Sequence, residues 1–291
     1  MALQTGAEAS SEPALRNISD TALWTAVYRA RETERPNALF RDPLASRLAG
    51  ERGRQIFAAL PFADRAAWSF IARTWVFDRF VMDEVGRGTD MVVNLAAGLD
   101  TRPYRMSLPA TLQWIEVDLP GIIDYKEQVL RQEKPVCRLE RVRLNLTDVK
   151  ARQDLFAKLG RRAKRVLIIC EGLLVYLSAD EVSSLARDLG TPTGFHGWAL
   201  DLASPGLLKL LQKKMGGPLS EAGSSLKFGP AEGPAFFSPY GWKPVEVHSM
   251  LKTAAQLGRL SWGMRLLALL PQSNGRQGSR PWGAGCLFAR T

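Results

Sequence analysis

The chain has 291 residues, of which 46% are apolar, and its net charge is +10. This content supports one enlarged α/β domain, or a domain with a cap, better than two independent domains. No window holds the roughly 18 uninterrupted apolar residues of a membrane span, and Glu8 and Glu12 stand where a signal peptide would be basic and then apolar, so we expect a cytoplasmic protein with no membrane partner.

The first 90 residues carry helical patterns and no strand pattern. Residues 1–18 are small and polar, and we expect them to form a flexible N-terminus. The spacing of apolar residues then predicts a helical cap over residues 19–90. Its expected helices cover residues 19–31, 43–50 and 62–85.

From Met91 onward, short apolar runs alternate with helical or loop signals. This alternation predicts a Rossmann-like α/β fold with a mostly parallel seven-stranded sheet. The expected strands are residues 91–97, 112–117, 138–144, 165–170, 197–202, 264–270 and 285–290. We expect the last two to form an antiparallel hairpin at the edge of the sheet, around the polar loop 271–281.

One segment of this predicted domain, which covers residues 91–291, has a different composition. Residues 203–240 are rich in Gly, Pro and Ser. We therefore expect them to form a lid or insertion instead of core structure.

The cysteines and histidines exclude several kinds of site. Cys137, Cys170 and Cys286 are far apart, and two of them lie in apolar runs, so we expect reduced core residues. His196 and His248 are the only histidines, and no Cys/His cluster predicts a metal site. A Ser-His-Asp hydrolase would also lack its usual G-x-S-x-G turn.

Polar residues follow the first two expected strands. Small residues and Gly98 end the first strand, where backbone can approach a ligand closely, and Glu116 and Asp118 end the second. A carboxylate at that position can accept both ribose hydroxyls of a nucleoside, and we select Asp118 for this role.

The turn after the first strand indicates which nucleoside cofactor fits. It lacks G-x-G-x-x-G and carries Asp100, which would repel a phosphate. S-adenosyl-L-methionine has no phosphate, so Asp100 and Glu171 suit its positive groups, although Asp100 can equally serve as a helix N-cap.

Several motifs in order resemble the leucine carboxyl methyltransferase-like family, and more closely its bacterial branch of S-adenosylmethionine-dependent methyltransferases. The resemblance extends over about residues 19–290, and it implies a class I methyltransferase fold. It is carried by AAGLDTRPYRM (96–106), EVDLP (116–120) with Lys126 following, EGLLVYL (171–177), ARETERPNALFRDPLA (30–45), ART (72–74) and GW (241–242).

The resemblance implies roles for individual residues. Gly98 and its neighbours would contact the cofactor, Asp118 would hold the ribose, Glu171 would lie along the methionine portion, and Arg73 would meet the carboxylate. Arg73 can alternatively form a surface ion pair with Asp78 or another neighbour.

Two positions depart from the family pattern. Ala96 replaces a usual Gly, and Asn145-Leu146 replaces an Asp-Leu pair near the adenine. Either change can weaken the affinity for the cofactor. Tyr176 and Tyr104 are candidates for the substrate pocket, with a core position as the alternative for Tyr176. No catalytic residue is assigned.

These observations predict methyl transfer to a carboxylate or hydroxyl oxygen of a small-molecule or protein-carboxylate acceptor. The alternatives are a non-catalytic S-adenosylmethionine-binding or scaffolding protein, a nucleic-acid methyltransferase and an NAD-dependent oxidoreductase. Residues 161–291 hold 16 basic and 8 acidic side chains, but no N/D-P-P-Y/F motif or basic stripe with aromatic residues supports a nucleic-acid partner. The sequence predicts no oligomeric state.

Overall fold

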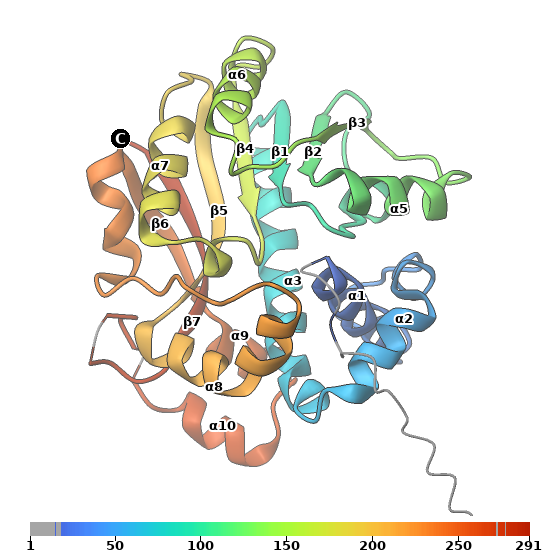
Figure 1. The fold of residues 1–291 in the computed structure, drawn as a ribbon, viewed down its shortest axis with the longest axis vertical. Coiled ribbons are helices and arrows are strands. Elements are labelled where there is room, and N and C mark those ends of the chain that lie inside the picture. The colour runs from blue at the N-terminus through green and yellow to red at the C-terminus, as the bar shows by residue number, and fades with distance from the viewer. Residues whose placement is uncertain (1–14, 16–18, 272, 277) are drawn as a thin grey trace, which may run out of the picture.

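A computed structural model describes residues 15, 19–271, 273–276 and 278–291 of the chain. Its centre is a seven-stranded sheet of order β3-β2-β1-β4-β5-β7-β6 (Figure 1). The strands are β1 Met91–Leu95, β2 Gln113–Asp118, β3 Arg138–Arg143, β4 Val166–Cys170, β5 Phe195–Ala203, β6 Trp242–Ser249 and β7 Gly283–Arg290. The first five are parallel, whereas β7 runs antiparallel to both β5 and β6. The predicted Rossmann-like fold with a mostly parallel sheet is confirmed.

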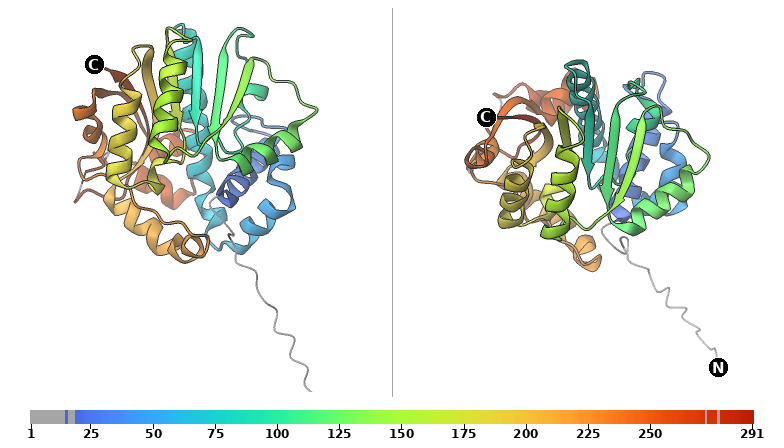
Figure 2. Two further views of the ribbon diagram at one scale, coloured as in Figure 1. Left: turned by 45° about the horizontal axis from the view of Figure 1, so that its top comes forward. Right: turned by 90° about the horizontal axis from the view of Figure 1, so that it is seen from above.

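Helices cover both faces of this sheet (Figure 2). They are α1 Asp20–Thr33, α2 Ala45–Ala59, α3 Ala63–Gly86, α4 Arg102–Arg105, α5 Pro120–Leu130, α6 Val149–Gly160, α7 Ala179–Leu189, α8 Pro205–Glu221, α9 Met250–Gln256 and α10 Trp262–Ala268, with the 3₁₀ turns η1 Leu174–Tyr176 and η2 Gly233–Tyr240. Alternate side chains of a strand point to opposite faces, so Val93 packs with α6 and α7 while Val92 packs with α3. The entirely buried strands β1 and β4 therefore form the centre of the core.

The N-terminal helices lie where the sequence predicts them, with one extension. The helix expected over residues 43–50 continues as α2 to Ala59, through a kink at Gly50, whose φ of 57° favours glycine. Of the expected flexible segment 1–18, Leu15 is buried in the structure, and the other residues lie outside the described part of the chain. None of the helices described is long and apolar enough to cross a bilayer.

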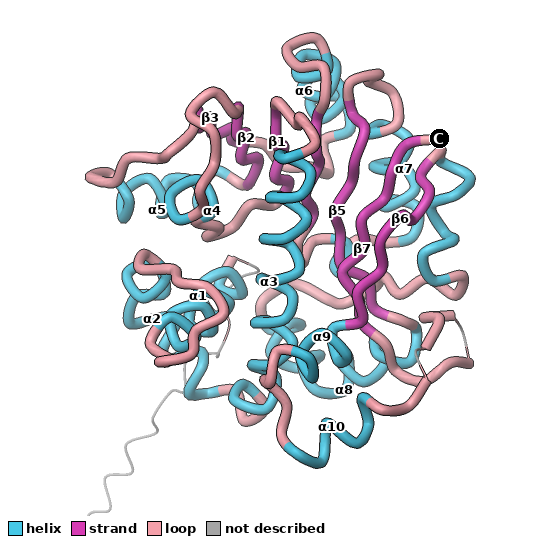
Figure 3. The backbone as a smooth tube through the Cα atoms, turned by 180° about the vertical axis from the view of Figure 1, so that it is seen from behind, coloured by secondary structure: helices cyan, strands magenta, loops and turns pink. Residues whose placement is uncertain are grey.

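The last part of the sheet differs from the prediction. Residues 264–270 do not form a strand; most of them belong to α10, which lies on the surface (Figure 3). The partner of β7 is instead β6, a partly exposed edge strand with a bulge between Pro244 and Glu246. The apolar run at 264–270 predicts an edge strand, whereas the real edge strand carries polar residues and a proline, which edge strands tolerate.

Residues 203–240 are also more ordered than their composition predicts. They contain α8 and η2, and Phe228 and Phe237 are buried in the main core. The expectation that this segment contributes no core structure was therefore wrong, because Leu208, Met215 and Leu219 of α8 are also buried, in a second cluster with residues of α1 and α2. The first half, α8, lies beyond the end of β5 and lines the cavity described next.

Candidate functional site

A cavity of about 1150 Å³ lies beyond the carboxyl ends of β1, β2, β4 and β5. The helical cap and residues 203–284 complete its walls. Nine of the residues selected from the sequence line it: Arg73, Ala96, Gly98, Asp100, Asp118, Asn145, Leu146, Glu171 and Tyr176. The tenth, Tyr104, does not.

Gly98 and Asp118 are in direct contact at the ends of the neighbouring strands β1 and β2. The Gly98 amide donates to Asp118 Oδ2 at 2.6 Å, and the Leu119 amide donates to Asp118 Oδ1 at 2.7 Å. Burial raises the pKa of Asp118, and these two amides only partly offset the effect. Asp118 is therefore a half-buried acceptor at the wall of the cavity, and backbone amides donate to both of its oxygens.

Glu116, the alternative carboxylate on β2, has a different use. Its oxygens are held by Lys126 Nζ at 2.7 Å and Arg141 Nε at 2.8 Å, and Glu116 and Lys126 are almost completely buried. Such a buried pair is stable only while both partners are present, so Glu116 and Lys126 support the sheet. The selection of Asp118 over Glu116 for ligand binding agrees with this geometry.

The turn after β1 has an unusual backbone at two positions. Gly98 has a φ of 49°, and a Cβ placed on it would lie 3.4 Å from the Ala22 methyl of α1. Ala96 has a φ of 53°, and it is the one non-glycine residue with positive φ among the described residues. A left-handed alanine costs roughly 1–2 kcal/mol, so the family's usual glycine at this position has a physical reason.

Asp100 is held in an ionised state on the cavity wall. Its Oδ2 accepts from Arg102 Nη1 at 2.8 Å and from Asn94 Nδ2 at 2.7 Å. Burial opposes the ionisation of Asp100, but the charges of Arg102 and Lys126 outweigh it and lower the pKa to about 2. Its Oδ1 also accepts from the Arg102 amide, but the N-cap of the short helix α4 is Thr101, so Asp100 precedes the cap instead of forming it.

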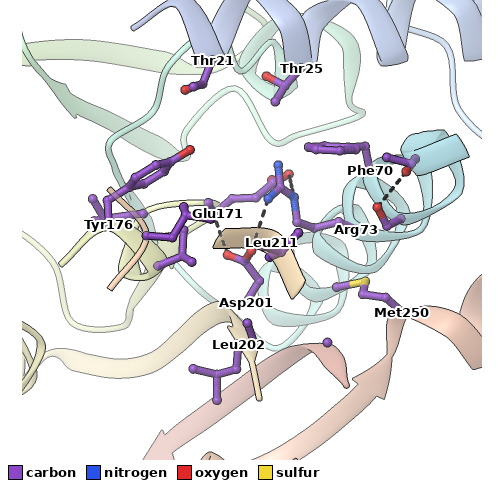
Figure 4. Close-up of a pocket in the computed structure, with 18 of the residues that line it drawn as sticks. Thr21, Thr25, Phe70, Arg73, Glu171, Tyr176, Asp201, Leu202, Leu211 and Met250 are labelled. Atoms are coloured by element: carbon purple, nitrogen blue, oxygen red, sulfur yellow. Dashed lines mark hydrogen bonds and ion pairs between the residues drawn. The ribbon is translucent and has the colours of Figure 1, made fainter. Parts of the chain in front are cut away.

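Arg73 reaches the cavity from α3 and joins two acidic side chains (Figure 4). Its Nε lies 3.1 Å from Glu171 Oε1, and its Nη1 lies 3.2 Å from Asp201 Oδ2. Burial opposes the charge of Arg73, but Asp201 and Glu171 outweigh it and raise its pKa. Asp78 is not the partner of Arg73, because it pairs with Arg102 and Arg105. The alternative of an ion pair with another neighbour is met, but at a side chain that is only 18% exposed and not at the surface.

Asp201 was missed by the sequence reasoning. It lies near the end of β5, and its second oxygen accepts from the Gly172 amide at 2.6 Å. A signal was available, because Asp201 is an acidic residue inside the apolar run WALDLA that was interpreted as a strand. An acidic group in such a run requires a partner.

Asn145 and Leu146 line the cavity after β3. The Asn145 side-chain oxygen accepts from the amide and the hydroxyl of Thr147, at 3.1 and 2.9 Å. The Asn145 side-chain oxygen is therefore engaged within its own turn, whereas an aspartate at this position would have a second oxygen to accept from a ligand.

The two candidate tyrosines have different surroundings. Tyr176 faces Thr21 of α1, with which it forms a hydrogen bond, and lies on the cavity wall with Arg73 (Figure 4). Burial raises the pKa of Tyr176, so its hydroxyl stays protonated at neutral pH. The Tyr104 hydroxyl instead accepts from Arg141 Nη2 at 2.6 Å, and the same arginine holds the buried Glu116. The placement of Tyr104 in the substrate pocket is therefore corrected.

Beyond Arg73 the cavity becomes apolar. Its walls there come largely from α8, α9 and α10, with lining residues that include Leu211, Met215, Met250, Met264, Leu267 and Leu270. Neither His196 nor His248 lines it. Within the part of the chain that the structure describes, no cluster of His, Cys, Asp and Glu is suited to a metal ion, and the cysteines are unpaired and buried.

Comparison of the sequence with those of known proteins identifies the family of the chain. Residues 22–190 match the leucine carboxyl methyltransferase family. The chain is 33% identical over 252 residues to SAV474 of Streptomyces avermitilis, covering 82% of this chain and 87% of that protein. It is 34% identical over 259 residues to FRAAL3718 of Frankia alni, with the same two coverages. Both relatives carry the provisional name of S-adenosyl-L-methionine-dependent methyltransferase.

Two solved structures share the fold at low sequence identity. A provisionally named methyltransferase from Thermobifida fusca has a TM-score of 0.59 at 17% identity, covering 96% of each chain. A DUF574 family protein from Streptomyces avermitilis has a TM-score of 0.57 at 14% identity, covering 93% of this chain and 97% of that one. With more than half of its residues matched by the family and about a third of the aligned residues identical to those of the relatives, the chain belongs to the leucine carboxyl methyltransferase family.

Proposed function

We propose that this protein transfers the methyl group of S-adenosyl-L-methionine to a carboxylate or hydroxyl oxygen of an acceptor. The observation that carries the proposal is the Asp118 carboxylate held by the Gly98 amide at one end of the cavity, with the Arg73, Glu171 and Asp201 cluster further along its wall. This order of groups matches a nucleoside followed by an amino acid.

The side chains present fit the cofactor. Asp118 would accept the ribose hydroxyls, Leu146 and Asn145 would flank the adenine, and Arg73 would meet the carboxylate. Asp100 and Glu171 would balance the ammonium and sulfonium charges. When bound, the cofactor supplies a methyl group activated by a positive sulfur. The low pKa of Asp100 keeps its negative charge available across the physiological range.

The surroundings of the cavity favour a carboxylate over a hydroxyl as the acceptor. A carboxylate is already ionised at neutral pH and needs no general base, whereas a hydroxyl would need one. Neither histidine lines the cavity, and the raised pKa of Tyr176 makes it a hydrogen-bond donor instead of a base. The contribution of the protein is then mainly to orient the acceptor and to exclude water.

A second candidate function is cofactor binding without catalysis. The strained backbone of Ala96 and the locally bonded Asn145 motivate it, because both depart from the family pattern where the cofactor would lie. Under this second candidate function, the protein would bind S-adenosyl-L-methionine and its demethylated product equally but would transfer no methyl group.

Calorimetry with S-adenosyl-L-methionine and with its demethylated product tests the proposal. We expect both to bind at one site, and an Asp118 variant to lose both. If neither ligand binds the folded protein, the proposed function is wrong. Binding without transfer to any acid or alcohol in a methyl-release assay would favour the second candidate.

A further inference from the structure

The cavity has more volume than one small ligand needs. Pockets for small molecules usually measure about 300–1000 Å³, and this one is larger. The residues assigned to the cofactor occupy the end of the cavity at the carboxyl ends of β1, β2, β3 and β4. The other end is lined by apolar side chains, and Met215, Leu226, Phe228 and Met250 are its buried members.

The apolar end of the cavity reaches solvent at α10. Leu267 and Leu270 line the cavity and are also exposed, at 54% and 43%. A side chain that lines a cavity and contacts solvent lies at its mouth. In Figures 1 and 3, α8, α9 and α10 lie together at this end of the molecule. An apolar path therefore connects the Arg73 cluster with the surface.

The charge around this path is positive. Residues 204–282 hold ten basic and three acidic side chains. Lys214 of α8 and Lys252 of α9 line the cavity, and no ion pair joins either of them to a carboxylate among the described residues. Cations beside an apolar wall attract a molecule with a negative group and a hydrocarbon body.

We infer that the methyl acceptor is a long-chain carboxylic acid, whose hydrocarbon body lies against α8 and α10 while its carboxylate reaches Tyr176. This inference rests on the proposed function. In the transfer, the oxygen–carbon bond of a methyl ester forms as the carbon–sulfur bond breaks. The negative charge of the acid and the positive charge of the sulfonium are both lost, and no proton moves.

Binding measurements on the full chain without cofactor test the substrate class directly. The probes are butanoate, octanoate and dodecanoate below their micelle concentrations, with dodecylammonium for the opposite head group. Each buried methylene should raise affinity by up to about fourfold, so dodecanoate should bind far more tightly than butanoate. Equal affinity across the series, or equal affinity for dodecylammonium, would overturn the inference.

Two neighbouring leucines of α10 provide a matched pair of variants. Leu266 and Leu267 are 55% and 54% exposed, but only Leu267 lines the cavity. Leu267→Ser should weaken dodecanoate binding roughly 3- to 10-fold, because it removes apolar contact at the mouth, whereas Leu266→Ser should leave it unchanged. Equal losses in both variants would show nonspecific surface binding and contradict the inference.

The failure of this inference is distinguishable from the failure of the proposed function. Calorimetry with the demethylated cofactor is run on the same samples and reports on the other end of the cavity. Cofactor binding without chain-length dependence overturns only the acceptor class. Chain-length dependence without cofactor binding overturns the proposed methyl transfer.

Discussion

The two ends of the cavity are built in different ways. At the end proposed to hold the nucleoside, called here the nucleoside end, the polar groups lie at the ends of strands of one sheet. Backbone amides fix them, as the Gly98 amide fixes Asp118 and the Gly172 amide fixes Asp201. At the far end, the walls come from α8, α9 and α10, carry apolar side chains and open to solvent. A sheet gives a fixed geometry to the proposed site of the cofactor, which is the same for every acceptor. Helices and loops outside the sheet can vary with the acceptor.

The sharpest test of this division is Asp118→Asn. The exchange keeps the size of the side chain but removes the negative charge that would accept two ribose hydroxyls, and a hydrogen bond to a charged group contributes roughly 1.5–3 kcal/mol. We expect the affinity for the demethylated cofactor to fall about 100-fold or more in calorimetry. Dodecanoate binding at the other end should change less than about twofold. A similar loss at both ends would break the division.

The pH dependence of the same site has a defined sign. If Asp118 holds the ribose as proposed, cofactor binding requires its ionised form, and burial raises the pKa of this group. Affinity should therefore fall as the pH is lowered, and the fall should begin at a higher pH than for an exposed aspartate. In Asp118→Asn the residual affinity should vary less with pH. An equally steep profile in the variant would assign the titration to another group.

Arg73 lies at the border between the two ends, and its removal should have an intermediate effect. Arg73→Gln leaves Glu171 and Asp201 without this cation and removes the proposed partner of the cofactor carboxylate. We expect cofactor affinity to fall about 10- to 30-fold.

Arg79 provides the matched control, since it also lies on α3, pairs with Asp83 and stacks on an aromatic ring. Arg79→Gln should leave cofactor affinity unchanged. If both variants lose affinity equally, the loss reflects the packing of α3 and not a contact with ligand.

The two ends also differ in how far the sequence predicts them. Gly98, Asp118 and Glu171 lie directly after buried strands, so strand patterns and the rule that ligands bind at strand ends bring them together. Leu211 and Met215 belong to helices whose packing no local pattern specifies. The apolar run at 264–270 shows the limit most clearly, because hydrophobic residues at an open cavity mouth have the same local pattern as a buried strand.

Ala96 gives the smallest and most local prediction. Replacing it with glycine removes a left-handed alanine, which costs roughly 1–2 kcal/mol, and adds backbone entropy to the unfolded chain, which costs roughly 0.5–1 kcal/mol. The free energy of unfolding in urea should therefore rise by about 0.5–1 kcal/mol. Ala97→Gly, at a buried neighbour without positive φ, should lower it by about 1 kcal/mol. Two losses of equal size would show that the turn at Ala96 is not strained. If Ala96→Gly is more stable and also binds the cofactor more tightly, the nucleoside end is under strain that this chain tolerates, and the rigid part of the site is then not fully optimised for its ligand.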